Sequence, residues 1–297
     1  MGKYNWYRFL ASLRSFLSIN FFIGKRVVWF SCEKNFGDLI NRDLIKAIGK
    51  NRISQVYSTE FIRFSHFLVI GSVLQISNNK SIVWGSGFHF ATSKFFYEPP
   101  QKVLSVRGAL TRDKLLQLNI SCPEVYGDPA LMTPGIFIPQ VQKKYKLGII
   151  PHYINLNDKW LSVLKNRNDF LIINVKEAPF DVISKILQCE NIISSSLHGL
   201  IISDAYNIPN LWIEFSQKIG ADRFKFYDYF SGVGRSHQNV LEIDNQLPEE
   251  IIDLIPSVKI NYNPIPLLDS CPFNVSYMVY TSIIEWYKKH KGNAANF

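Results

Sequence analysis

Short apolar runs alternate with segments of helical periodicity along most of the chain. Each run typical of a buried strand precedes a polar turn and then apolar residues spaced three and four positions apart. Because strands of parallel sheets are buried on both faces, this rhythm predicts α/β architecture with helices on both faces of a parallel sheet. The predicted strands are 26–30, 67–71, 82–85, 103–106, 147–150, 170–175, 191–193 and 211–213, and the predicted helices are 37–48, 109–118, 158–164, 180–188, one opening at His198, and 280–289.

A stretch punctuated by proline and glycine, 126–139, interrupts this rhythm and is a plausible domain junction. We therefore expect two Rossmann-like domains, 1–139 and 140–297, facing a central cleft. Ligands in open α/β sheets bind at the carboxyl ends of the strands, so both halves would aim their loops at that cleft. The proline-richer tail from about Leu247 ends in an aromatic and basic helix, and the sequence leaves open whether this tail crosses back over the first half.

Composition narrows the function classes. Of 297 residues, 47% are hydrophobic and 19% charged, which favours sizeable cores over disorder. The net charge of +9 suits a phosphorylated or polyanionic partner or an acidic membrane surface. The basic residues of the chain are scattered along the sequence, so no nucleic-acid partner is expected. The four cysteines form no CxxC pair, so we expect no metal site or disulfide framework, and a reducing cytosol is the simplest setting.

An amphipathic stripe of aromatic, leucine and arginine residues occupies 1–24. Such a stripe more often docks on its own domain, which is the interpretation that we favour. The alternative is peripheral contact with the inner face of the plasma membrane. The predicted localisation is cytoplasmic in either case, since no apolar run reaches the length of about 18 residues needed to span a bilayer.

The segment 193–206 carries the most informative pattern. An apolar run ends in three serines, and His198 and Gly199 then open a helix. Backbone N–H groups and the positive end of the helix dipole make such a turn suited to a phosphate or carboxylate, which Ser195 and Ser196 would help to hold. An imidazole there could move a proton near neutral pH. The alternative is a capping serine followed by a histidine that only packs.

The first predicted strand ends in a similar turn. Asn35, Gly37 and Asp38 open the following helix, where glycine permits close approach and Asp38 offers a carboxylate. The alternative role for Asp38 is an N-cap that stabilises the helix by ~1 kcal/mol.

Two further turns supply candidate contacts. Arg107 lies just past a strand and could pair with a phosphate or carboxylate, or else form an ion pair with Asp113 or Asp128. The turn at Gly85, Ser86 and Gly87 lacks a full phosphate-binding motif, so its backbone is expected to line the cleft.

Basic residues also occupy 218–229. They could hold a charged group, with Lys225 the candidate. The alternative is a solvated loop with aromatic anchors, which is the default for the individual lysines.

In order along residues 26 to 230, the chain resembles the polysaccharide pyruvyl transferase family. The resemblance rests on the motifs NFGD at 35–38, WGSG at 84–87, VRG at 106–108 with TR at 111–112, YGDPA at 126–130, SSLHG at 195–199 and KFYDY at 225–229. Where the family often has a second acid after NFGD, this chain has Leu39.

The resemblance implies a fold like that of GT-B glycosyltransferases. It also implies phosphoenolpyruvate as the donor and a pair of sugar hydroxyls as the acceptor, with a pyruvate ketal and phosphate as products. A lipid-linked oligosaccharide acceptor is a separate hypothesis, which would explain the basic charge and the aromatic N-terminus. No metal or organic cofactor is expected.

Within that chemistry we expect His198 to act as acid and base, Arg107 to bind the donor, and Asp38 to take a proton from the acceptor hydroxyl or orient it. Alanine at His198 or Arg107 should lower turnover by orders of magnitude and leave folding intact. The alternatives are a GT-B glycosyltransferase that uses a nucleotide sugar, and a non-catalytic basic scaffold on a membrane surface.

Overall fold

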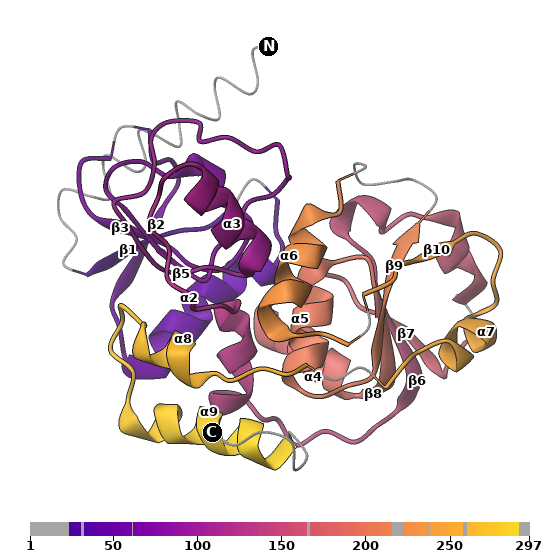
Figure 1. Cartoon of the computed structure of the whole chain (residues 1–297). Coiled ribbons are helices and arrows are strands. Elements are labelled where there is room, and N and C mark those ends of the chain that lie inside the picture. The colour runs from indigo at the N-terminus through magenta and orange to yellow at the C-terminus, as the bar shows by residue number, and fades with distance from the viewer. Residues whose placement is uncertain are drawn as a thin grey trace.

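The computed structural model describes residues 24–30, 33–60, 62–164, 167–215, 222–236, 238–257 and 260–290. They form two parallel five-stranded sheets with helices, an α/β fold consistent with two Rossmann-like domains (Figure 1). The first sheet has the order β2-β1-β3-β4-β5. Its strands are β1 (Lys25–Val28), β2 (Ile53–Val56), β3 (His66–Leu68), β4 (Ser81–Trp84) and β5 (Lys102–Ser105).

The second sheet has the order β10-β9-β8-β6-β7. Its strands are β6 (Tyr145–Ile150), β7 (Phe170–Ile172), β8 (Cys189–Ser194), β9 (Asn210–Phe215) and β10 (Leu241–Ile243). Every pairing in both sheets is parallel, so each sheet gathers the carboxyl ends of its strands at one edge.

Helices connect the strands. The α-helices are α2 (Phe36–Gly49), α3 (Ala109–Gln117), α4 (Pro179–Leu187), α5 (Leu197–Ala205), α6 (Phe224–Val233), α7 (Pro248–Asp253), α8 (Ile265–Asp269) and α9 (Tyr277–His290). Short 3₁₀ segments are η1 (Leu74–Ile76), η2 (Pro129–Gly135), η3 (Tyr153–Asn155) and η4 (Lys159–Leu164).

The predicted α/β rhythm is confirmed, although several elements differ from the prediction, among them the helices α7 and α8, which were not predicted. The expected helix over 158–164 is the 3₁₀ segment η4. The strands β2 and β10 were not predicted, because one is a half-buried edge strand with polar residues and the other has three residues. The loop interpretation of 218–229 is wrong from Phe224 onward, since α6 buries aromatic side chains at helical spacing.

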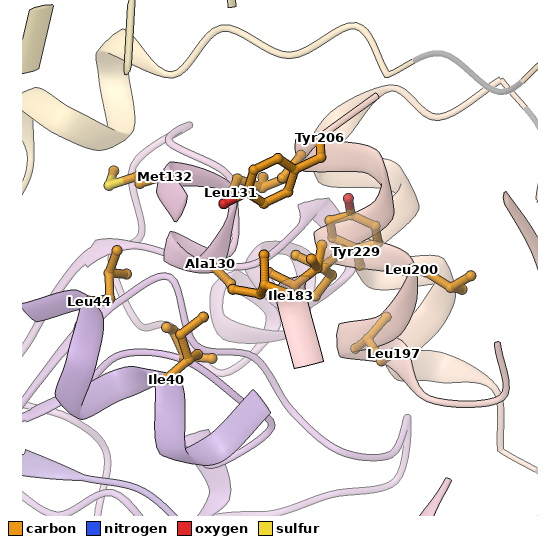
Figure 2. Packing of buried hydrophobic residues seen from close by; sticks show 14 of the residues in the cluster. Ile40, Leu44, Ala130, Leu131, Met132, Ile183, Leu197, Leu200, Tyr206 and Tyr229 are labelled. Atoms are coloured by element: carbon orange, nitrogen blue, oxygen red, sulfur yellow. The ribbon is translucent and has the colours of Figure 1, made fainter. Parts of the chain in front are cut away.

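One hydrophobic core joins the two halves of the chain. Ile40 and Leu44 of α2 share a cluster with Leu131 of η2, Ile183 of α4 and Leu200 of α5 (Figure 2). Burying these side chains together contributes about 1.5–3 kcal/mol for each one removed from water. The shared core therefore fixes the two helices, α2 and α5, whose N-termini carry the candidate site.

The C-terminal segment packs against the first half. The Trp84 indole donates to the carbonyl of Leu267 at 3.0 Å, and the Tyr287 hydroxyl donates to that of Leu131 at 2.9 Å. Helix α9 lies along η2 and α2 (Figure 1). The predicted junction at 139 falls between η2 and β6, and the amphipathic stripe at 1–24 lies outside the described residues except Gly24. No helix within the described part of the chain has the length and apolarity to span a membrane.

Candidate active site

The candidate site lies where loops from both sheets meet. Asp38, His198 and Lys225 lie in the first turns of α2, α5 and α6, the helices that follow β1, β8 and β9. The loops after β4 and β5 carry His89 and Arg107. The charges of Arg107 and Lys225 act on the His198 imidazole, and Lys225 also acts on Asp38 and His89. The structure thus brings together residues that are up to 187 positions apart in the sequence.

The N-terminus of α2 contacts the His198 ring directly. Asn35 is the N-cap, and its side chain accepts from the Gly37 N–H at 3.1 Å. Asp38 is therefore a first-turn residue, and the alternative in which it caps the helix is wrong. Phe36 packs edge-on against the imidazole, and a Cβ built on Gly37 would lie 2.0 Å from its Nδ1. Only glycine leaves room for the ring at that position.

Asp38 and Lys225 form an interacting pair of titratable groups. Desolvation raises the pKa of Asp38 to about 7, although the positive charge of Lys225 opposes this shift. Desolvation and the charge of Arg107 lower the pKa of Lys225 to about 8, although Asp38 opposes that change. Both groups can exchange protons near neutral pH, which is a property of acid–base sites.

His198 is the second residue of α5 and is 8% exposed. Burial, and then the charges of Arg107 and Lys225, lower its pKa to about 3, so the imidazole is neutral at pH 7. Its Nε2 lies 3.8 Å from Oδ2 of Asp128. A negatively charged ligand near these cations would oppose their effect and raise the pKa of His198.

Arg107 is fully buried and joins the two halves. Its Nε donates to Asp228 Oδ2 on α6 at 2.9 Å, and Nη1 and Nη2 donate at 2.7 Å to the Ser72 hydroxyl and the Phe88 carbonyl. Thr111 donates to the same carboxylate through its N–H and its hydroxyl. The alternative prediction that Arg107 pairs with Asp113 or Asp128 is wrong, since its carboxylate partner is Asp228.

The turn after β4 supports Arg107. Gly85 has φ of +87°, in the region that favours glycine, and the Ser86 hydroxyl donates to the Gly71 carbonyl at 2.9 Å. A Cβ on Gly87 would lie 2.7 Å from both Arg107 Nη2 and Asp228 Oδ2. In the described structure this turn thus holds neighbouring backbone and the ion pair, and its role in binding substrate stays a prediction.

The serine turn before α5 is tightly packed. Ser195 accepts from the His152 N–H at 2.9 Å and donates its own N–H to Ile150. Ser196 is the N-cap of α5, and a Cβ on Gly199 would lie 2.2 Å from the Ser194 hydroxyl. Helix α5 can therefore lie directly on β8, and its N-terminal turn carries His198.

A hollow opens beside this turn, at the carboxyl edge of the second sheet. Its lining includes His89, Ser195 and Lys225, with Phe90, Asn155 and Asp222 around them. Desolvation and the charge of Lys225 lower the pKa of His89 to about 4 and that of His152 to about 3. The lining also includes Glu214, which pairs with Arg223 at 2.7 Å, so Lys225 is a cation that a small anion in this partly enclosed hollow could contact.

Sequence reasoning assigned no catalytic role to Asp128 or Asp228. Asp128 lies beside His198, and Asp228 fixes Arg107. Both belong to motifs quoted for the family resemblance, YGDPA and KFYDY, which were the available signal. Within the described ranges, no group of three or more His, Cys, Asp or Glu side chains is arranged to hold a metal ion.

The chain is similar in sequence to known proteins. An uncharacterized protein of Acanthamoeba polyphaga mimivirus, L143, is 29% identical over 217 residues, which are 69% of this chain and 73% of that protein. The succinoglycan biosynthesis protein ExoV of Rhizobium meliloti is 29% identical over 218 residues, 72% of this chain and 66% of ExoV. The family model for polysaccharide pyruvyl transferase matches residues 5–217, well over half of the chain. The chain therefore belongs to the polysaccharide pyruvyl transferase family.

Proposed function

We propose that this protein transfers a pyruvyl group from phosphoenolpyruvate to two hydroxyls of one sugar, forming a cyclic pyruvate ketal and releasing phosphate. The observation that carries this proposal is the meeting of Asp38, His198 and Lys225, which come from three loops and both halves of the chain. Together they supply a cation for the donor and two groups that exchange protons. Family membership supports the same reaction class.

The first step adds one sugar hydroxyl to the donor. His198, as imidazolium, gives its proton to C3 of the enolpyruvate double bond, and C2 becomes electrophilic. The hydroxyl oxygen bonds to C2 while the Asp38 carboxylate takes its proton. The product is a tetrahedral carbon that carries the methyl, carboxylate, phosphate and sugar oxygen.

The second step closes the ketal. The bond between C2 and the phosphate oxygen breaks, and its electron pair leaves with phosphate. The second sugar hydroxyl then bonds to C2, and its proton leaves with the phosphate as HPO₄²⁻. Asp38 returns the proton that it holds to His198 through solvent, so the enzyme regains its starting state.

The negative charge of the donor makes these proton transfers possible. Phosphoenolpyruvate brings a phosphate and a carboxylate beside Lys225 and the N-terminus of α5, which both favour anions. The same negative charge raises the pKa of His198 above the value of about 3 that burial and the two cations give it. Donor binding thus prepares the acid, and Ser195 in the lining of the hollow is placed to contact the donor. Arg107 contributes positive charge from its buried position.

The acceptor in this proposal is a sugar of an exopolysaccharide or of its lipid-linked precursor, a class favoured by the relative named for succinoglycan biosynthesis. We further propose a GT-B-like arrangement of the two halves and a reaction without metal or organic cofactor. Peripheral membrane contact through 1–24 would suit a lipid-linked acceptor. The competing function is a nucleotide-sugar glycosyltransferase of similar architecture.

Calorimetric titration with phosphoenolpyruvate tests the donor without knowledge of the acceptor. We expect saturable binding that Lys225→Gln weakens at least about tenfold, the loss of one charge-assisted contact. Lys144→Gln, at an exposed lysine before the second sheet, is the matched control and should bind normally. No saturable phosphoenolpyruvate binding together with tight binding of a nucleotide sugar would favour the glycosyltransferase instead.

A further inference from the structure

Three polar atoms beside the candidate site are buried with no hydrogen-bond partner among the described residues. They are Nε2 of His198, Oδ2 of Asp128 and the hydroxyl of Tyr262. Leaving a buried polar group unpaired is unfavourable, and three such groups in one place point to a shared role.

Asp128 is held in place by its other carboxylate oxygen. Oδ1 accepts from the Ala130 N–H at 2.9 Å and caps η2, which leaves Oδ2 directed toward His198 Nε2 at 3.8 Å. The two atoms lie just beyond hydrogen-bonding distance, and such bonds in enzymes often tighten only when substrate binds.

Tyr262 reaches the same place from the C-terminal segment, beyond the residues that match the family model. A Cβ on Gly127 would lie 2.3 Å from the Tyr262 hydroxyl, so that hydroxyl packs against the residue preceding Asp128. Burial raises the pKa of Tyr262 well above its usual value, and the negative charge of Asp128 raises it further. A tyrosine that keeps its proton can donate a hydrogen bond to the carboxylate.

We propose that Asp128 is a positioning residue that holds His198 in the tautomer with the proton on Nε2, and that the Tyr262 hydroxyl supports the Asp128 carboxylate. Nδ1 of His198, on the side of Gly37, then carries the lone pair. In the reaction proposed above, on which this inference rests, Nδ1 is the atom that gains and gives the proton. An acid that fixes the tautomer of a catalytic histidine raises turnover more than affinity.

The tautomer can be measured in the free protein by ¹⁵N NMR of labelled histidine, with the His198 signal among six histidines assigned from the spectrum of His198→Gln. We expect Nε2–H in the wild type. Asp128→Asn keeps an oxygen for the Ala130 N–H but presents an NH₂ group to the imidazole, so the proton should move to Nδ1. If Asp128→Asn leaves the tautomer unchanged, the proposal is wrong, whatever reaction the protein catalyses.

Kinetics supply the second readout. Asp128→Asn should lower kcat about a hundredfold or more and change KM for phosphoenolpyruvate by less than about threefold. Tyr262→Phe should lower kcat more mildly, and it tests the same site if Asp128→Asn does not fold. Tyr287→Phe is the matched control, since its hydroxyl donates to the Leu131 carbonyl in the same cluster. Equal losses in the two tyrosine variants would show a packing effect and overturn the role of Tyr262.

Discussion

Gly37 of the first half lies directly against the imidazole of His198 in the second half. A Cβ added to Gly37 would come within 2.0 Å of Nδ1 and 2.7 Å of the histidine Cβ. The contact crosses from the N-terminus of α2 to the N-terminus of α5, so it fixes the ring between two helix ends. Side-chain size at position 37 therefore controls the position of the proposed acid.

Gly37→Ala should displace the imidazole and lower kcat about a hundredfold, since small misplacements of reacting groups cost that much. Overpacking costs about 1–3 kcal/mol, and the helix gains about 1 kcal/mol from replacing glycine, so the free energy of unfolding should fall only modestly. The control is Gly49→Ala, at the other end of α2, whose Cβ would meet the Asn274 carbonyl at 1.6 Å. It should lower Tm and leave the turnover of folded protein intact. If Gly37→Ala retains normal kcat, the ring position is not critical.

Arg107→Ala should destabilise the protein by about 3–5 kcal/mol, because it leaves Asp228 buried without its cation. This differs from the sequence-based expectation that folding would remain intact, which did not foresee full burial of the side chain. Urea unfolding of Arg107→Ala, Asp228→Ala and the double variant measures the coupling. We expect the double variant to lose much less than the two single losses combined.

The conservative variant Arg107→Lys distinguishes charge from geometry. A lysine retains the charge, but its single ammonium nitrogen cannot reproduce the planar guanidinium, whose three nitrogens donate to Asp228, Ser72 and Phe88. It should be intermediate in stability. Additive losses in the double variant would mean that the ion pair contributes little to joining the two halves.

The sequence predicted most of the fold because apolar runs and helical spacing are local signals. It also located the turns of Asp38, Arg107 and His198, since parallel strands place their carboxyl ends at one edge. It did not predict which charges pair across the halves. The partnership of Arg107 with Asp228 spans 121 positions and depends on how α6 packs beside α3. The partial burial of Lys225 was missed for the same reason, because the basic residues around it look like a solvated loop.

The stability of Asp38→Asn relative to wild type should change with pH. The pKa of Asp38 is raised from 3.8 to about 7 in the folded protein, so the unfolded chain loses this proton first as pH rises. Stability that the protonated carboxyl contributes is present below pH 4 and is lost between about pH 4 and 7. An asparagine side chain does not titrate in this range, so residue 38 of the variant contributes no such dependence of stability on pH. We expect urea unfolding to show that the free energy of unfolding of Asp38→Asn, relative to that of wild type, increases by at least about 1 kcal/mol between pH 4.5 and 8. About 1 kcal/mol is close to the free-energy equivalent of one pKa unit.

Asp43 provides the control for that pH series. It lies on the same helix, one turn beyond Asp38, and pairs at 2.7 Å with Arg42, whose side chain is half exposed. Asp43→Asn should show no gain toward pH 8. A flat difference between wild type and Asp38→Asn would mean that the Asp38 carboxyl is ionised throughout, and it would remove this residue as a proton carrier.

The last prediction concerns a buried hydrogen-bond network at the far end of α5. Arg235 donates from Nη1 to both carboxylate oxygens of Asp204 at 2.6 and 2.7 Å, and the Tyr229 hydroxyl donates to Asp204 at 2.9 Å. These contacts join α5 to α6, the helix that carries Lys225. The network thus fixes the distance between His198 and Lys225 from outside the site.

Asp204→Asn should lower the free energy of unfolding by about 3–5 kcal/mol, because Arg235 is left as a buried cation facing a neutral amide. Tyr229→Phe removes one hydrogen bond and should cost about 1–2 kcal/mol. Tyr280→Phe, which breaks an exposed tyrosine–carboxylate bond to Asp269, should change stability by less than about 0.5 kcal/mol. Urea unfolding ranks the three variants. At a temperature where each stays folded, kcat should fall less than about tenfold, since none of these side chains lies in the site. A larger loss in Tyr229→Phe than in Asp204→Asn would show that the hydroxyl, rather than the buried charge pair, fixes α5 against α6.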